Sequence, residues 1–152
     1  MARFASGVTV VAARDEGEDV LRTASAFVSV SLEPPLVLVS LGTRSRLAGV
    51  LRTQPCWTVS MLSAGQRPIA ARFSTRDRPS DRLLLAGLEH HRSPLSGTVL
   101  FDRAVATVEC RTQQLVQAGD HVLAIGLVVA TELGDRAARP LLYVDRAYHT
   151  PS

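Results

Sequence analysis

Lysine is absent from this chain, and all 17 of its basic residues are arginine. The arginines are scattered singly and form no basic tract, and the net charge is only +3. Aromatic residues make up 5% of the chain, so the stacking platforms that accompany single-stranded nucleic-acid binding are also scarce. These absences argue against a nucleic-acid-binding protein.

Long hydrophobic runs and cysteine-rich motifs are absent as well. No apolar run reaches the roughly 20 residues that a membrane-spanning helix needs, and residues 1–7 lack the apolar core of a signal peptide. Only two cysteines occur, Cys56 and Cys110, far apart and without the spacing of a metal site. We therefore expect two buried, free thiols and a cytoplasmic protein.

What remains is the composition of an ordinary globular protein. The 152 residues are 46% hydrophobic and 20% charged, which excludes a disordered chain and is enough for a sizeable core. There are no internal repeats and no linker-like segment. We therefore expect a single domain over residues 1–152.

The stretch from Thr23 to Leu41 carries the clearest strand pattern. Residues 27–32 alternate between apolar and small polar types, which predicts a strand with one buried and one wetter face. Two prolines at 34 and 35 interrupt the pattern, and the apolar run 36–39 predicts a strand buried on both faces. Hydroxyl side chains near the strand ends could bind a polar ligand or satisfy backbone groups: Thr23, Ser25 and Ser40.

The rest of the chain reads as short strands joined by turns. Strands are expected at residues 8–13, 57–62, 99–101, 104–116, 121–131 and 141–144, with hairpins around Gly17 and Gly119. Short helices are expected at 45–52, capped by Ser45, and at 69–73 after a Ser63–Gln66 capping box, whereas 82–88 fits a helical turn or a strand. Loops are expected at 74–80, which should be mobile, and at 89–97 and 134–140, with a tail at 146–152. This pattern predicts a mainly β, closed or partly closed barrel.

The histidines form no catalytic or metal-binding constellation in the sequence. None of His90, His91, His121 and His149 has ligand spacing to acids or cysteines, and no serine–histidine–aspartate arrangement is evident. We expect no metal site, and we expect His90 and His91 to be solvated in a loop. Trp57 is expected in the core.

Five segments together resemble the flavin reductase-like, FMN-binding split-barrel family. They occur in the family's order and span Phe4 to Tyr148: Phe4–Val11, Thr23–Leu41, Val59–Ser63 with Gln66 and Arg72–Phe73, Ala118–His121 with Ile125–Gly126, and Pro140–Tyr143. The resemblance implies a six-stranded Greek-key split β-barrel with short flanking helices. It implies NAD(P)H-dependent reduction of FMN or FAD, in a homodimer that supplies reduced flavin to a partner monooxygenase by diffusion.

The resemblance also implies a set of binding residues. Thr23, Ala24 and Ser25 would lie along the isoalloxazine edge. Ser40, Leu41, Arg44, Ser45 and Arg46 would surround the ribityl phosphate, with one of the two arginines in contact with it. A second cofactor-facing segment comprises Ser60, Ser63, Gln66, Arg72 and Phe73, although Phe73 also fits a core position. His121 and Tyr148 would lie near the nicotinamide, with His121 orienting the amide and no obligatory catalytic side chain.

Four departures from the family pattern keep a second function open. Leu21 and Arg22 stand where the family has glycine and an apolar residue, Ser60 replaces an asparagine, and Leu127 replaces a glutamate. An N-terminal helix that usually precedes Phe4 is reduced or missing. Flavin binding would then be weak or lost. The alternative is a cofactor-less barrel whose cavity, lined by Leu21, Leu127 and other apolar side chains, binds or cyclises an apolar small molecule in a biosynthetic pathway.

Overall fold

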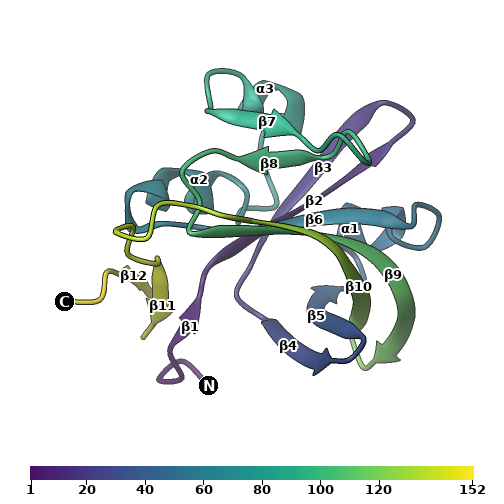
Figure 1. Ribbon diagram of the computed structural model, residues 1–152, viewed down its shortest axis with the longest axis horizontal. Helices are drawn as coiled ribbons and strands as arrows, with labels where there is room; N and C mark the ends of the chain where they lie inside the picture. The colour runs from purple at the N-terminus through teal and green to yellow at the C-terminus, as the bar shows by residue number, and fades with distance from the viewer.

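The computed structural model describes residues 1–152, and a curved sheet of seven strands dominates it (Figure 1). The strand order is β3-β2-β6-β9-β10-β5-β4, with every neighbouring pair antiparallel. Because β3 and β4 end the order without pairing to each other, the sheet is open along one side. The mainly β expectation is confirmed, whereas the six-stranded barrel that the resemblance implies is not, since this sheet has seven strands. The bounds are β2 Thr9–Asp15, β3 Glu18–Ala24, β4 Phe27–Leu32, β5 Pro35–Gly42, β6 Cys56–Met61, β9 Ala106–Ala118 and β10 His121–Leu133.

Two tight turns join the longest antiparallel pairs. The β2–β3 turn places Gly17 at a φ of 82°, and the β9–β10 turn places Gly119 at a φ of 60°. Glycine adopts this left-handed conformation without the steric cost of a side chain. Both hairpins predicted from the sequence are therefore confirmed, and the second one pairs Ala118 with His121.

Two small sheets complete the β structure, and both contain strands that the sequence pattern misses. β1 (Ser6–Gly7), β11 (Leu142–Val144) and β12 (Ala147–His149) form one sheet, and β7 (His90–Arg92) pairs with β8 (Val99–Phe101). The expected loop at 89–97 and the expected tail at 146–152 are thus wrong in part. The missed strands β7 and β12 show no apolar alternation. They form through backbone pairing with β8 and β11, and not through burial of one face.

The helices are short, and α1 and α3 begin at serine side-chain caps. α1 (Arg46–Val50) begins at Ser45, whose Oγ accepts from the Ala48 N–H at 3.2 Å, and it ends before the expected Arg52. The predicted capping box is confirmed at the 3₁₀-helix η1 (Ala64–Gln66), where Gln66 Oε1 accepts from the Ser63 N–H at 3.0 Å. α2 (Arg67–Arg72) follows directly, and α3 (Asp81–Leu85) is a helical turn in the undecided segment 82–88. No helix here has the length and apolar character to span a membrane.

Two apolar cores lie on opposite faces of the same strands. Val11 and Ala13 of β2 belong to one core, beside α1 and Trp57, whereas Val10 and Ala12 belong to the other, beneath α2, α3 and β8. Both faces of β2 are therefore buried. Trp57 and Phe73 are fully enclosed, which confirms the core interpretation of their side chains.

The structure corrects three expectations about burial. The strand expected to have one buried face is β4, an edge strand. Its residues Val28, Val30 and Leu32 are 53%, 48% and 85% exposed, so no other part of the chain covers them. On β5 only one side of the expected doubly buried run is enclosed, since Val37 and Val39 are buried and the leucines between and beside them are half-buried. Both cysteines are free, but only Cys110 is buried and Cys56 is half-buried.

Candidate active site

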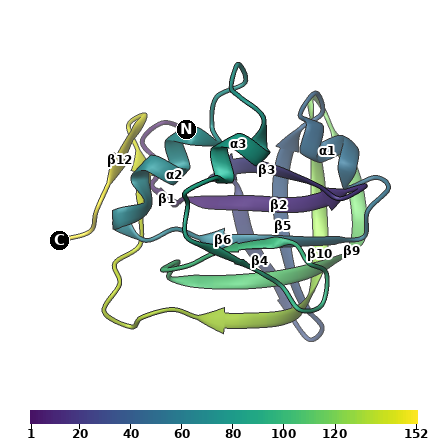
Figure 2. The ribbon, with the colours of Figure 1, turned by 90° about the horizontal axis from the view of Figure 1, so that it is seen from above.

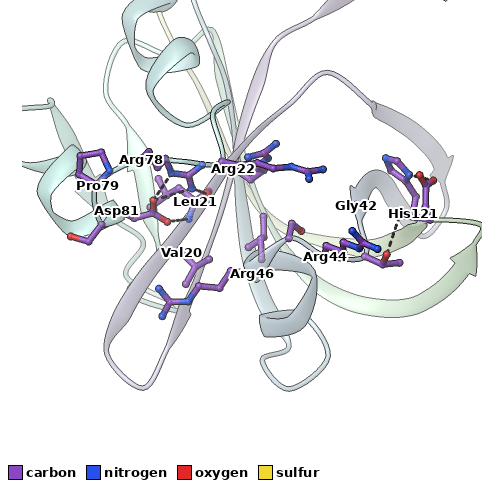
Figure 3. A pocket seen from close by; sticks show the side chains of 16 residues that line it. Val20, Leu21, Arg22, Gly42, Arg44, Arg46, Arg78, Pro79, Asp81 and His121 are labelled. Carbon is purple, nitrogen blue, oxygen red and sulfur yellow. Dashed lines mark hydrogen bonds and ion pairs between the residues drawn. The ribbon is translucent and has the colours of Figure 1, made fainter.

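One cleft of about 750 Å³ lies where β3, the turn after β5, the start of β10 and the loop 74–80 meet (Figure 3). Five arginines, two aspartates and one histidine line it, beside three apolar residues. A cleft with this lining suits an anionic, polar ligand. The lining residues are Val20, Leu21, Arg22, Gly42, Thr43, Arg44, Ser45, Arg46, Leu47, Arg76, Arg78, Pro79, Ser80, Asp81, Asp120 and His121.

The predicted phosphate turn and the predicted nicotinamide residue are neighbours in the sheet. Gly42 at the end of β5 pairs with His121 at the start of β10. The Thr43 N–H and Oγ1 both donate to the Asp120 carbonyl, at 2.9 and 3.1 Å. This pairing places the turn 43–46 and His121 on one stretch of the cleft, although they are far apart in the sequence.

Within the turn, Arg44 is the free cation. Ser45 Oγ is used by the α1 cap, and Arg46 Nη2 pairs with Glu18 Oε2 at 2.7 Å. Arg44 is exposed and no carboxylate lies within ion-pair distance of it. Of the two arginines predicted at the phosphate, Arg44 is thus the one that is available.

His121 is held by its neighbour in the chain. Its Nδ1 lies 2.8 Å from Asp120 Oδ1, and the pKa of the Asp120 carboxyl is lowered, first by this hydrogen bond and then by the His121 charge. Because an ionised carboxylate only accepts, Nδ1 donates and Nε2 is left without a partner in the protein. Nε2 can therefore contact a ligand in the cleft.

The three predicted flavin-edge residues, and Ser40 and Leu41 of the predicted phosphate site, differ in whether their side chains are free to bind a ligand. Thr23 Oγ1 donates to the Ala70 carbonyl at 2.7 Å and is engaged internally, while Ala24 and Leu41 are buried. Ser25 is exposed and Ser40 is half-buried, and neither hydroxyl makes a hydrogen bond within the protein. Ser25 and Ser40 are therefore the two hydroxyls of this group that remain available.

The second predicted segment does not line the cleft. Ser60 Oγ accepts from the Phe101 N–H at 3.0 Å, Gln66 Nε2 donates to the Asp102 carbonyl at 2.6 Å, and Ser63 is buried in the capping box. Phe73 is enclosed with its ring 6.0 Å from that of Phe101. Only Arg72 is exposed. In one chain, four of these five residues serve packing and internal hydrogen bonding.

Tyr148 is not brought together with His121. It lies on β12, with its ring 5.4 Å from that of Tyr143 and the Arg67 guanidinium 5.8 Å above it. β12 stands at the opposite end of the molecule from the β9–β10 turn in both ribbon views (Figures 1 and 2). The two residues predicted near the nicotinamide are therefore separate within one chain.

Sequence reasoning missed the arginines of the loop 74–80. Arg78 donates to three carbonyls, those of Phe73, Thr75 and Leu21, at 3.1, 2.8 and 2.7 Å, and pairs with Asp81 at 2.9 Å. These bonds fasten the expected mobile loop against β3. The high arginine content of the segment was the only signal of its role.

The cleft is not the apolar cavity that the alternative function requires. Leu21 touches the cleft, but its side chain is 1% exposed and packs in the core. Leu127 does not line the cleft. The departures at these two positions therefore leave the cleft charged.

Comparison with known proteins identifies the family of the chain. The chain is 40% identical, over 97% of its length and 90% of the relative, to the reductase component of 4-hydroxyphenylacetate 3-monooxygenase from Thermus thermophilus. It is 39% identical, over 100% of its length and 85% of the relative, to an NADH:riboflavin 5'-phosphate oxidoreductase from Streptomyces pristinaespiralis. Its fold matches the crystal structure of BorF, the flavin reductase component of a bacterial two-component tryptophan halogenase, with a TM-score of 0.92 at 32% identity, covering 98% of this chain and 92% of BorF. The family model for the flavin reductase-like domain matches residues 1–152. The chain belongs to the flavin reductase-like domain family.

Proposed function

We propose that this protein is an NAD(P)H:flavin oxidoreductase that supplies reduced flavin to a partner monooxygenase. The observation that carries the proposal is the cleft that Arg44 and His121 both line, where the β5–β10 pairing joins the turn before Arg44 to His121. The similarity to the reductase component of a two-component monooxygenase supports it.

The side chains available in and beside the cleft fit a flavin nucleotide. Arg44 in the cleft is a free cation for the phosphate. The unpaired hydroxyls of Ser40 and Ser25 do not line the cleft itself, and we assign Ser40 to the phosphate and Ser25 to the polar edge of an isoalloxazine ring. Bound flavin supplies the hydride acceptor, which no side chain can provide. The protein itself contributes binding and orientation.

His121 is the residue that orients the nicotinamide. With Nδ1 donating to Asp120, Nε2 is free to bond to the carboxamide group of the substrate. Transfer of a hydride needs no proton at this position, so His121 acts by positioning. A cofactor-less enzyme acting on an apolar molecule is not favoured, since arginine and aspartate side chains dominate the cleft.

We also infer a homodimer formed through β4. This edge strand exposes Val28, Val30 and Leu32, three apolar side chains next to unpaired backbone groups that a second copy would cover. The predicted contact of Tyr148 with nicotinamide requires such a second copy, because Tyr148 is remote from His121 in one chain. Light scattering should give twice the chain mass, and Val28→Glu should give a single chain mass.

Three further inferences complete the proposal. We infer that the open seven-stranded sheet is the split barrel of the family. Residues 1–152 form one domain, because both cores share β2. The cytoplasm is the proposed location, since a reducing compartment keeps both cysteines as free thiols.

The test is to titrate the purified protein with FMN and FAD and to follow oxidation of NADH and NADPH with each flavin. We expect flavin binding and flavin-dependent oxidation of the nicotinamide. A protein that binds neither flavin and oxidises neither nicotinamide would overturn the proposal. Adding an oxygenase that uses reduced flavin, separated by a dialysis membrane, then tests transfer by diffusion.

A further inference from the structure

Arg22 and Arg78 both donate hydrogen bonds to the Thr75 carbonyl on the β3 side of the cleft. The Thr75 carbonyl accepts from Arg78 Nη1 at 2.8 Å and from Arg22 Nη1 at 3.4 Å, so the two guanidinium groups lie close together. Arg76 follows Thr75 directly and lines the same cleft. Figure 3 shows Arg22 in the middle of the cleft, between Arg78 on one side and Arg44 and His121 on the other.

The two aspartates that line the cleft are already engaged. Asp81 pairs with Arg78, and its second oxygen accepts from the Leu21 N–H at 2.9 Å. Asp120 is bonded to His121, and Glu18 to Arg46. No carboxylate lies within ion-pair distance of Arg22 or Arg76. This part of the cleft therefore carries positive charge without a counter-ion.

The electrostatic consequence is visible at Arg22. The pKa of its guanidinium is lowered, first by burial, then by the charges of Arg78 and Arg76, with Asp81 opposing them. Like charges held together in a partly buried place repel, and a bound anion relieves that repulsion. Arg78 fastens the loop to β3, so Arg76 is presented from a tethered segment.

We propose that Arg22 and Arg76 form a second anion subsite in the cleft, which binds the diphosphate bridge of a dinucleotide. This inference rests on the proposed function, in which Arg44 holds the single phosphate of FMN. A dinucleotide carries a further phosphate, and the uncompensated charge of Arg22 and Arg76 is the group in the cleft that matches it. FAD and the nicotinamide dinucleotide both contain this bridge, and the test distinguishes them.

The experiment measures binding of ADP, the half that FAD and NADH share, together with FMN, FAD and NADH. Arg22→Gln and Arg76→Gln are compared with Arg52→Gln, which removes an exposed arginine that does not line the cleft. We expect each cleft variant to weaken ADP binding about tenfold and FMN binding less than about twofold, and we expect Arg52→Gln to change neither. Arg22→Lys, which keeps the charge, should recover most of the ADP affinity.

The FAD affinity and the KM for NADH show which dinucleotide places its diphosphate in the subsite. A loss of FAD affinity with an unchanged KM for NADH assigns the subsite to the flavin, and the reverse assigns it to the nicotinamide substrate. Unchanged ADP, FAD and NADH binding in both variants would overturn the inference, as would an equal loss of affinity for FMN.

Reduction of FMN by the unmodified protein tests the proposed function separately, and ADP binding reports on the subsite even if that reduction fails. Arg76 is exposed on a loop, so Arg76→Gln keeps the test valid if Arg22→Gln does not fold.

Discussion

Gly126 on β10 lies against the indole ring of Trp57 on β6, although β9 separates the two strands in the main sheet. A Cβ atom at Gly126 would stand 2.5 Å from Trp57 Cζ2 and 2.9 Å from Cys110 Cβ. The β9–β10 register shifts at this point, between Ile125 and Gly126. The lack of a side chain at Gly126 therefore lets the curved sheet close over Trp57.

Gly126→Ala should destabilise the protein by roughly 1–3 kcal/mol, because the added methyl group forces the fully buried Trp57 to move. Urea denaturation measures the change. Gly49→Ala on α1 is the control, since outside its own helix backbone and its chain neighbours nothing lies within 4 Å of the added carbon, and alanine favours helix. Equal stability of the Gly126 variant and the unmodified protein would contradict this account.

The two cysteines should differ sharply in reactivity. Burial, with a contribution from the Glu109 charge, raises the pKa of the Cys110 thiol to about 12, whereas Cys56 is half-buried. In native protein near pH ~8, DTNB should modify one thiol quickly, and Cys56→Ser should abolish that reaction. In urea both thiols should react. Two fast thiols in the native protein would show that the structure around Cys110 opens readily.

Arg44→Gln should raise the KM for FMN about tenfold, because it removes a charge-assisted contact to phosphate. The kcat should change little, since the residue binds the phosphate and not the reacting ring. Steady-state kinetics with varied FMN provide the measurement, and Arg52→Gln serves as the matched exposed arginine. An unchanged KM would place the phosphate elsewhere in the cleft.

His121→Ala should lower kcat/KM for NADH about tenfold while leaving FMN affinity nearly unchanged, because His121 orients the nicotinamide. His121→Asn, which can still bond to a carboxamide, should retain more activity than the alanine variant. Stopped-flow reduction at varied NADH separates binding from the hydride step. If FMN affinity falls instead, His121 contacts the flavin.

A pH-dependent contribution to stability should arise on β7. The pKa of His91 is raised, chiefly by its hydrogen bond to Asp102 at 2.6 Å, against burial and with help from Glu132. Since the folded-state pKa lies above the unfolded value, the contribution is complete below about pH 6.5 and is lost as the pH rises through the raised pKa. The side chain is 42% exposed, so the loss should not exceed about 1 kcal/mol.

Chemical denaturation at several pH values checks this pH dependence. The difference in unfolding free energy between the unmodified protein and His91→Gln should shrink as the pH rises. Asp102→Asn should reduce the same difference, because it removes the main partner of His91. A constant difference across the range would show that His91 contributes nothing through its charge.

Local residue preferences explain what could be predicted from the sequence. Gly17 and Gly119 mark turns because they adopt positive φ, and Ser63 and Gln66 mark a helix start because their side chains satisfy free backbone groups. The motifs around Thr23–Leu41 and Gly119–His121 were enough to indicate the family. β7 and β12 were missed since their residues show no alternation, and the exposure of β4 depends on its place at the sheet edge.

Only the tertiary structure decided how the candidate site is assembled. The sequence by itself indicated that the turn after Leu41 and His121 belong to one function, but their contact depends on the β5–β10 register. It could not show that Arg46 and Arg78 are neutralised by Glu18 and Asp81 while Arg22, Arg44 and Arg76 are not. Ion pairs join residues that are distant in the chain, so the charge that a cleft offers to a ligand is determined by packing and not by composition.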